Sequence, residues 1–187
     1  MSSTTRGRPL IRGTVVGVAT FLAGYLATYL WQASRVRESL SGINAILQFF
    51  GGEQIPAWKA VGWLFFNAHF VRTQFPGFGG MQSQNFIASG DFPALLYAVP
   101  VLFLLAAGFL LAWIRTPADL QQGAMDGATI AIGYAVVAVV AVFLFGASRG
   151  DASIAPDPIT GVLLAGIVYP LVLGAVGGAI AGVASSS

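Results

Sequence analysis

Hydrophobic residues are gathered along this chain into four long blocks that contain no charged side chain. The blocks are Gly13–Trp31, Ala94–Ile114, Gly127–Ser148 and Ile159–Ala184. A helix crosses about 30 Å of hydrocarbon with roughly 20 apolar residues, and each block has about that length. The pattern therefore predicts four membrane-spanning helices, joined by segments that hold the charged residues.

The segment between the first two blocks has a different pattern. Apolar residues recur every three or four positions along Val36–Phe50, which predicts an amphipathic helix that continues the first span or lies at the membrane surface. Pro56–Val71 is almost wholly apolar, but as a helix it would be only about 24 Å long. We therefore expect residues 36–71 to be interfacial or re-entrant, and a short fifth span over Pro56–Val71 is the alternative.

The other connections are interpreted as a loop and as helix starts. Glycine, amide and hydroxyl residues are frequent in Arg72–Phe92, which predicts a loop. An aspartate beside an early proline is typical of a helix start, because its carboxylate accepts bonds from unpaired backbone N–H groups. We expect this role for Asp91 and Asp157. Thr116-Pro117 is expected to open the connection after the second span in the same way, with Asp119 in its first turn, and Asp126 to begin the third span.

Composition supports one all-α membrane domain over residues 1–187. Hydrophobic residues make up 56% of the chain and charged residues only 9%, far below the quarter that is usual in soluble domains. Nine basic and seven acidic side chains, most of them near predicted helix ends, do not make a nucleic-acid-binding surface. Cysteine is absent and histidine occurs once, so we expect no disulfide, no metal site and no cofactor.

The basic residues before the first block set the expected orientation. Arg6, Arg8 and Arg12 precede it, so the N-terminus is predicted to be cytoplasmic and the chain a multi-pass protein of the plasma membrane. The first block is longer than the apolar part of a signal peptide, and we expect it to be retained as an anchor. A fifth span would satisfy the distribution of basic residues about as well.

Two glycine strips predict close contacts between helices. Gly174, Gly178 and Gly182 recur at four-residue steps, and Gly13 and Gly17 have the same spacing. Lipid tails are as apolar as leucine, so spanning helices associate through small residues that let their backbones approach. The strips favour packing within one chain, and contact between copies in a homo-oligomer is the alternative, because both use the same mechanism.

Candidate chemistry is sparse. No block contains an ionisable side chain, which argues against a proton-coupled pump. His69 is unique, but the chain has no nucleophile or metalloprotease motif and no phosphate-binding loop, so we expect no enzymatic activity. The best candidates for contact with a ligand or partner are Trp58, Trp63, Asn67 and His69, which an aromatic-rich stretch brings close together.

Three stretches resemble a known family. The sequence VGWLFFNAHFV (Val61–Val71), the loop that ends at Asp91 and the sequence GVLLAGIVYPLVLGAVGG (Gly161–Gly178) are similar to an uncharacterised family of multi-pass membrane proteins from halophilic archaea, a domain of unknown function. The GW-x-x-x-NAHFV pattern is the most specific part. The resemblance implies an archaeal plasma membrane and a topology, but no activity and no catalytic residue. Proteins of halophiles are usually acidic, whereas this chain is mildly basic.

The functional prediction is correspondingly general. We expect a non-enzymatic scaffold or accessory subunit that contacts a partner, a membrane lipid or an envelope component through its outer segment. A small oligomeric channel or transporter is the alternative, with the glycine faces lining or closing the pore. A larger membrane complex or a homo-oligomer is the expected setting.

Overall fold

The computed structural model describes residues 7–49, 53–77, 79–149 and 152–185. Its helices are α1 (Gly7–Phe49), α2 (Ala57–Asn67), α3 (Ala98–Arg115), α4 (Leu120–Ala128), α5 (Ile130–Leu144), α6 (Pro158–Thr160) and α7 (Tyr169–Ser185), with a 3₁₀ turn η1 (Ala94–Tyr97) and a π-helical stretch η2 (Gly161–Val168). Its strands are β1 (Thr73–Gly77), β2 (Gly80–Gln84), β3 (Ala147–Arg149) and β4 (Ala152–Pro156).

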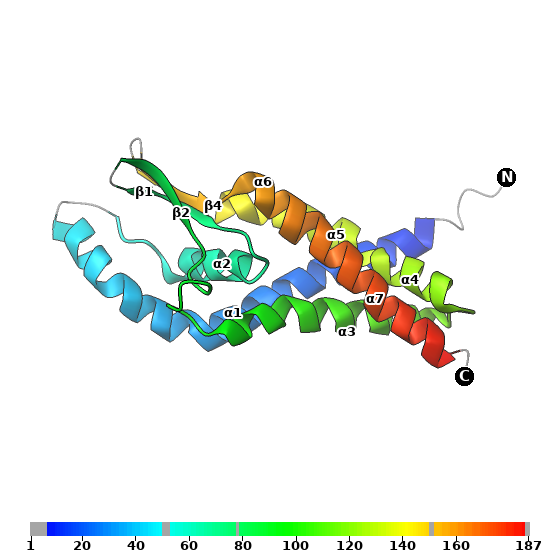
Figure 1. Ribbon diagram of the computed structural model, residues 1–187. Coiled ribbons are helices and arrows are strands. Elements are labelled where there is room, and N and C mark those ends of the chain that lie inside the picture. The colour runs from blue at the N-terminus through cyan, green and yellow to red at the C-terminus, as the bar shows by residue number, and fades with distance from the viewer. Residues whose placement is uncertain (1–6, 50–52, 78, 150–151, 186–187) are drawn as a thin grey trace.

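Four helical segments among the described residues are long and apolar enough to cross a membrane, as predicted. They are Leu10–Gly42, Ala94–Arg115, Leu120–Leu144 and Pro158–Ser185. They form an elongated bundle, with the first residues of α1 and the last of α7 at the same end (Figure 1). Large apolar side chains such as Leu102, Val136 and Leu163 are exposed on its outside, which suits a surface in contact with lipid.

The opposite end of the bundle carries a smaller unit, which we call the distal module. Its described residues are 36–49, 53–77, 79–92, 145–149 and 152–157, and it includes the last turns of α1, all of α2 and the strands (Figure 1). The helix α1 is continuous into this module and bends where it leaves the bundle. The helix α2 has 11 residues and is therefore about 16 Å long, too short to cross a bilayer.

The expectation of an all-α chain is wrong in one respect, because the distal module contains a small antiparallel sheet with strand order β2-β1-β4-β3. The predicted loop forms a hairpin in which Thr73 pairs with Gln84 and Gly77 with Gly80. Gly80 has a φ of +131°, which a residue with a side chain rarely adopts, so glycine permits the reversal. The strand β4 then joins β1 from a distant part of the chain, with Thr73 opposite Pro156.

The third span begins earlier than predicted. Helix α4 starts at Leu120, so Asp126 lies inside a spanning segment rather than at its start. Its carboxylate pairs with Arg115 at the end of α3, with 2.6 Å between nitrogen and oxygen. A carboxylate within a helix at this depth is acceptable because the opposite charge lies next to it.

The predicted cap at Asp157 is confirmed, and the one at Asp91 is wrong. Asp119, expected in a first turn, is instead the N-cap of α4, and Thr116 ends α3 rather than opening a helix. Asp119 accepts a bond from the backbone N–H of Gln122 at 2.7 Å, and Asp157 does the same for Thr160. Asp91 caps no helix: η1 follows Pro93, which makes no side-chain cap. The Asp91 carboxylate instead accepts a hydrogen bond from the Ser89 hydroxyl at 2.6 Å.

The glycine strips pack within the chain at the end of the bundle nearest the termini. A Cβ atom added to Gly178 would collide with the carbonyl oxygen of Gly123, and one added to Gly174 would lie 2.8 Å from the carbonyl oxygen of Gly127. Further such contacts join Gly182 to Asp119, Gly17 to Ile130 and Gly13 to Thr129. Backbones touch here without intervening side chains, so α1, α4, α5 and α7 are held together by close approach rather than by bulky residues.

Candidate functional site

The end of α2 is inserted into the core of the bundle beside the aromatic residues of α1 and α5. The side chains of Phe65 and Phe66 are buried, and both contact the ring of Phe21 on α1. Phe21 also packs against Tyr134, which lies ten residues before the end of α5 at Leu144, or about 15 Å along the helix. The distal module is thus anchored within the bundle rather than resting on it.

His69 is fully buried, and both nitrogens of its ring are engaged. Nδ1 lies 2.7 Å from the carbonyl oxygen of Phe65, and Nε2 lies 2.8 Å from the hydroxyl of Tyr134. A carbonyl can only accept, so Nδ1 carries the proton and Nε2 accepts a bond from Tyr134. Burial lowers the pKa of His69 to about 4, although the bond to Phe65 opposes this effect. At neutral pH His69 is therefore uncharged, and its two hydrogen bonds link α2 to α5.

Asn67 joins three segments of the distal module. Its amide nitrogen donates to the carbonyl oxygen of Val71 at 2.8 Å and to the hydroxyl of Thr73 at 3.2 Å. Its amide oxygen accepts from the backbone N–H of Phe86 at 3.0 Å. The chain reverses between these contacts at Phe70, which has a φ of 60°. Asn67 therefore fixes the turn after α2, the start of β1 and the loop that follows β2.

The two tryptophans of α2 lie at the distal end of α5. The indole N–H of Trp63 donates to the carbonyl oxygen of Phe145 at 2.8 Å, and the ammonium of Lys59 donates to that of Gly146 at 2.5 Å. The last carbonyls of a helix have no partner within it, so α2 supplies donors for the end of α5. Trp63 is buried, whereas Trp58 is 37% exposed and packs against Phe145.

Of the four residues that the sequence proposed for contact with a ligand or partner, three are inside the protein. Asn67 and His69 are completely buried, Trp63 nearly so, and only Trp58 presents appreciable surface. The four lie along α2 and the turn that follows it, and the side-chain polar atoms of Trp63, Asn67 and His69 bond to the chain itself. The free surface of the distal module lies elsewhere.

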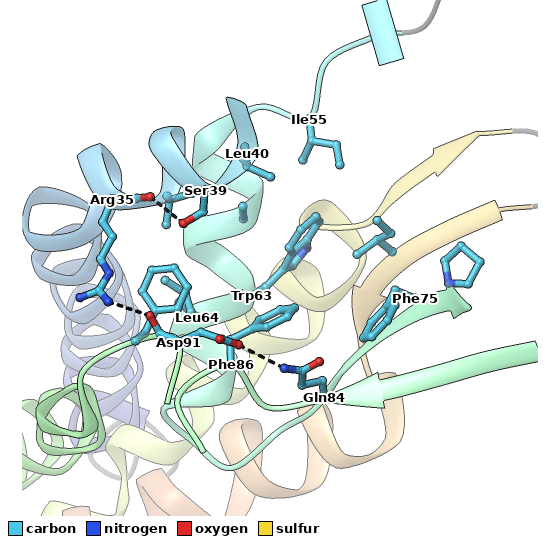
Figure 2. Close-up of a pocket in the computed structure, with 15 residues that line it drawn as sticks. Arg35, Ser39, Leu40, Ile55, Trp63, Leu64, Phe75, Gln84, Phe86 and Asp91 are labelled. Atoms are coloured by element: carbon cyan, nitrogen blue, oxygen red, sulfur yellow. Dashed lines mark hydrogen bonds between the residues drawn. The ribbon is translucent and has the colours of Figure 1, made fainter. Parts of the chain in front are cut away.

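A cavity of about 590 Å³ lies between residues 35–40 of α1, the helix α2 and the sheet. Small-molecule sites commonly have volumes of about 300–1,000 Å³ and are mostly apolar. Figure 2 shows Trp63, Leu64 and Phe86 at its centre, with Phe75 and Ile55 toward one end and Arg35 and Asp91 toward the other. The cavity is therefore an apolar chamber with one polar end, which we call the distal pocket.

The polar end of the distal pocket is built from α1 and the loop after β2. Arg35 donates from Nη2 to the backbone oxygen of Asp91 at 3.0 Å, and its guanidinium carbon lies 5.4 Å from the centre of the Phe92 ring. The Asp91 carboxylate accepts from the amide of Gln84 at 3.2 Å. Ser39 also borders the pocket, and its hydroxyl donates to the backbone oxygen of Arg35.

Sequence reasoning did not find the distal pocket. Asp91 was expected to cap a helix, and nothing in that prediction joins it to Arg35. Three distant segments form the walls, and the pattern of residues does not reveal that the sheet brings them together. The described residues contain no group of three or more histidine, cysteine or acidic side chains that could hold a metal ion.

The chain belongs to a family of unknown function, DUF7978, whose model matches residues 1–185. The predicted resemblance to an uncharacterised family is confirmed to this extent. No curated protein and no solved structure matches the chain.

Proposed function

We propose that this protein is a non-enzymatic accessory protein of the plasma membrane, and that its distal pocket holds the apolar chain of a lipid or of a lipid-linked envelope component. The observation that carries the proposal is the pocket itself: an apolar chamber with one polar end, next to the ends of the spans. An amphiphile has the same division into apolar and polar parts. The proposed setting is an archaeal plasma membrane, with the N-terminus in the cytoplasm and the distal module outside.

The position of the pocket supports access from the bilayer. Arg35 follows Trp31, the end of the first charge-free block, by four residues, and Asp91 precedes the start of the second span at Ala94 by three. The polar end is thus near the level of the lipid head groups, and the apolar part extends along the distal module. A chain that moves into it exchanges one apolar surrounding for another, so the hydrophobic effect opposes the move little.

The chemistry around the pocket supports binding rather than catalysis. His69, the one histidine of the chain, has both ring nitrogens engaged in the core. A general base needs a nucleophile and an orienting partner within hydrogen-bond reach. The hydroxyl of Ser39 is engaged with a backbone carbonyl of its own helix. The ordered polar groups at the pocket suit recognition of a ligand's polar part.

The test uses purified protein in vesicles that contain a lipid with a photoreactive diazirine at the end of one chain. After irradiation, cross-linked peptides are located by mass spectrometry. We expect cross-links to residues of the pocket such as Leu64 and Phe75, in addition to those on the outside of the bundle. Cross-links confined to the outside of the spans would contradict the proposal.

Two matched variants separate the pocket from its surroundings. Ser39 borders the pocket, whereas Ser41 lies on the same helix and does not, and both side chains bond to backbone carbonyls of that helix. Tryptophan at position 39 would fill the chamber from an exposed position, so Ser39→Trp should abolish the pocket cross-links. Ser41→Trp, with the same added volume, should leave them unchanged, and circular dichroism checks that both variants fold.

A further inference from the structure

Resting on the proposed function, we propose that the polar end of the distal pocket selects a lipid whose head group has no net charge and carries several hydroxyl groups, such as a sugar or another polyol. The fold places two opposite charges at this end, those of Arg35 and Asp91. Neither forms an ion pair with the other: the contact between them runs from the guanidinium to a backbone oxygen.

Arg35 keeps donors available for a ligand. Within the described part of the chain its guanidinium makes one hydrogen bond, to the Asp91 backbone oxygen, although the group has five N–H donors. Its contact with the Phe92 ring holds the group in position. The exposed guanidinium can therefore donate its remaining N–H groups to oxygen atoms of a head group.

Asp91 supplies the complementary acceptor. Its Oδ2 atom accepts from Ser89 at 2.6 Å and from Gln84 at 3.2 Å, and these two donors fix the plane of the carboxylate. Figure 2 shows the carboxylate directed toward Gln84 and the Arg35 guanidinium directed toward the Asp91 backbone, so donor and acceptor flank the same end of the pocket.

This pair of charges discriminates among head groups. A phosphate-bearing anionic head is attracted by Arg35 and repelled by Asp91, so the two effects largely cancel. A hydroxyl group both donates and accepts, so neighbouring hydroxyls bond to Asp91 and Arg35 together. The ring of Phe92, which lies against the Arg35 guanidinium, borders the same end and offers apolar surface to the carbon skeleton of a sugar.

The experiment is a competition for the diazirine cross-link in the pocket. Three unlabelled lipids with identical chains serve as competitors: a neutral monoglycosyl lipid, a zwitterionic phosphatidylcholine and an anionic phosphatidylglycerol. We expect the monoglycosyl lipid to compete about tenfold better than the anionic one, since charge-assisted bonds are the stronger ones. Preference for the anionic lipid would overturn the inference. Equal competition by all three would also overturn it, but would leave the proposed function standing.

A charge-only variant supplies the second measurement. Asn can accept the bonds from Ser89 and Gln84, so Asp91→Asn removes the negative charge and keeps the local contacts. We expect competition by the anionic lipid to improve about three- to tenfold in this variant. Glu38→Gln is the matched control, because Glu38 is exposed on α1 and does not border the pocket. Equal changes in the two variants would mean a general effect of charge and would contradict the inference.

Discussion

The buried imidazole of His69 should make the stability of the protein depend on pH. Burial lowers its pKa from 6.5 to about 4, and the residue lies outside the four spans. Below pH 6.5 the unfolded chain binds a proton at this position, whereas the folded chain does not do so until about pH 4. Stability therefore rises with pH in this window, is fully present above 6.5 and is lost progressively as the pH falls toward 4.

The size of the effect follows from the two pKa values. One unit of pKa corresponds to about 1.4 kcal/mol, so a difference between 6.5 and about 4 corresponds to roughly 3 kcal/mol in full. Between pH 7 and pH 5 the linkage relation gives a loss of about 2 kcal/mol from this group. The expected change is a large fraction of the stability of a typical domain.

The perturbation that isolates this term is His69→Phe, which keeps an aromatic ring and removes the titrating group. It also leaves Tyr134 and the carbonyl of Phe65 without a partner, at about 1–3 kcal/mol each, so the variant is less stable at every pH. The informative quantity is therefore the change between pH 7 and pH 5, measured by denaturant unfolding in detergent micelles with tryptophan fluorescence. The wild type should lose about 2 kcal/mol more than the variant over this range. Equal losses would refute the assignment of a neutral, buried imidazole.

Three other predictions test the rest of the fold. Asn67→Ala removes the partner of the buried Val71 carbonyl and of the half-buried Phe86 N–H, and it should lower the free energy of unfolding by about 2–4 kcal/mol in the same titration. Gly178→Leu must push helices apart and should cost at least about 3 kcal/mol in thermal unfolding, whereas Val176→Leu on the exposed side of α7 should cost little. Because the chain has no cysteine, Ser83→Cys and Ser185→Cys each introduce a single thiol. Three spans separate the two positions, so an impermeant maleimide added outside sealed vesicles of uniform orientation should label only one of them. Labelling of both would contradict an odd number of spans between the distal module and the C-terminus.

The spans were predictable because their signal is local. Absence of charge over about 20 residues is a property of the sequence alone, and it located all four helices. The cap at Asp157 was found for the same reason, since its partner Thr160 is three residues away. The start of the third span was missed because Asp126 looked like a boundary, and nothing nearby in the sequence reveals that Arg115 neutralises it.

The distal module was not predictable because its contacts are distant in sequence. The strand β1 contains Pro76 and Gly77, which weaken any strand signal, and its neighbour β4 begins only at Ala152. The candidates Trp63 and His69 were placed near an interface because they are polar-tipped residues in an apolar stretch. That pattern does not distinguish burial in protein from contact with lipid, and the difference comes from partners such as Tyr134.

The attachment of α2 to the bundle has a consequence for biosynthesis. Trp63 cannot form its hydrogen bond until Phe145 has been synthesised, 82 residues later. His69 likewise precedes its partner Tyr134 in synthesis. At about 5–20 residues per second, the interval for Trp63 is roughly 4–16 s. During that time the aromatic stretch has left the ribosome without its native neighbours, so the nascent chain must rely on lipid or on a chaperone to shield it. Closure of the distal module is then among the last events of maturation, and a chain truncated before α5 could not complete it.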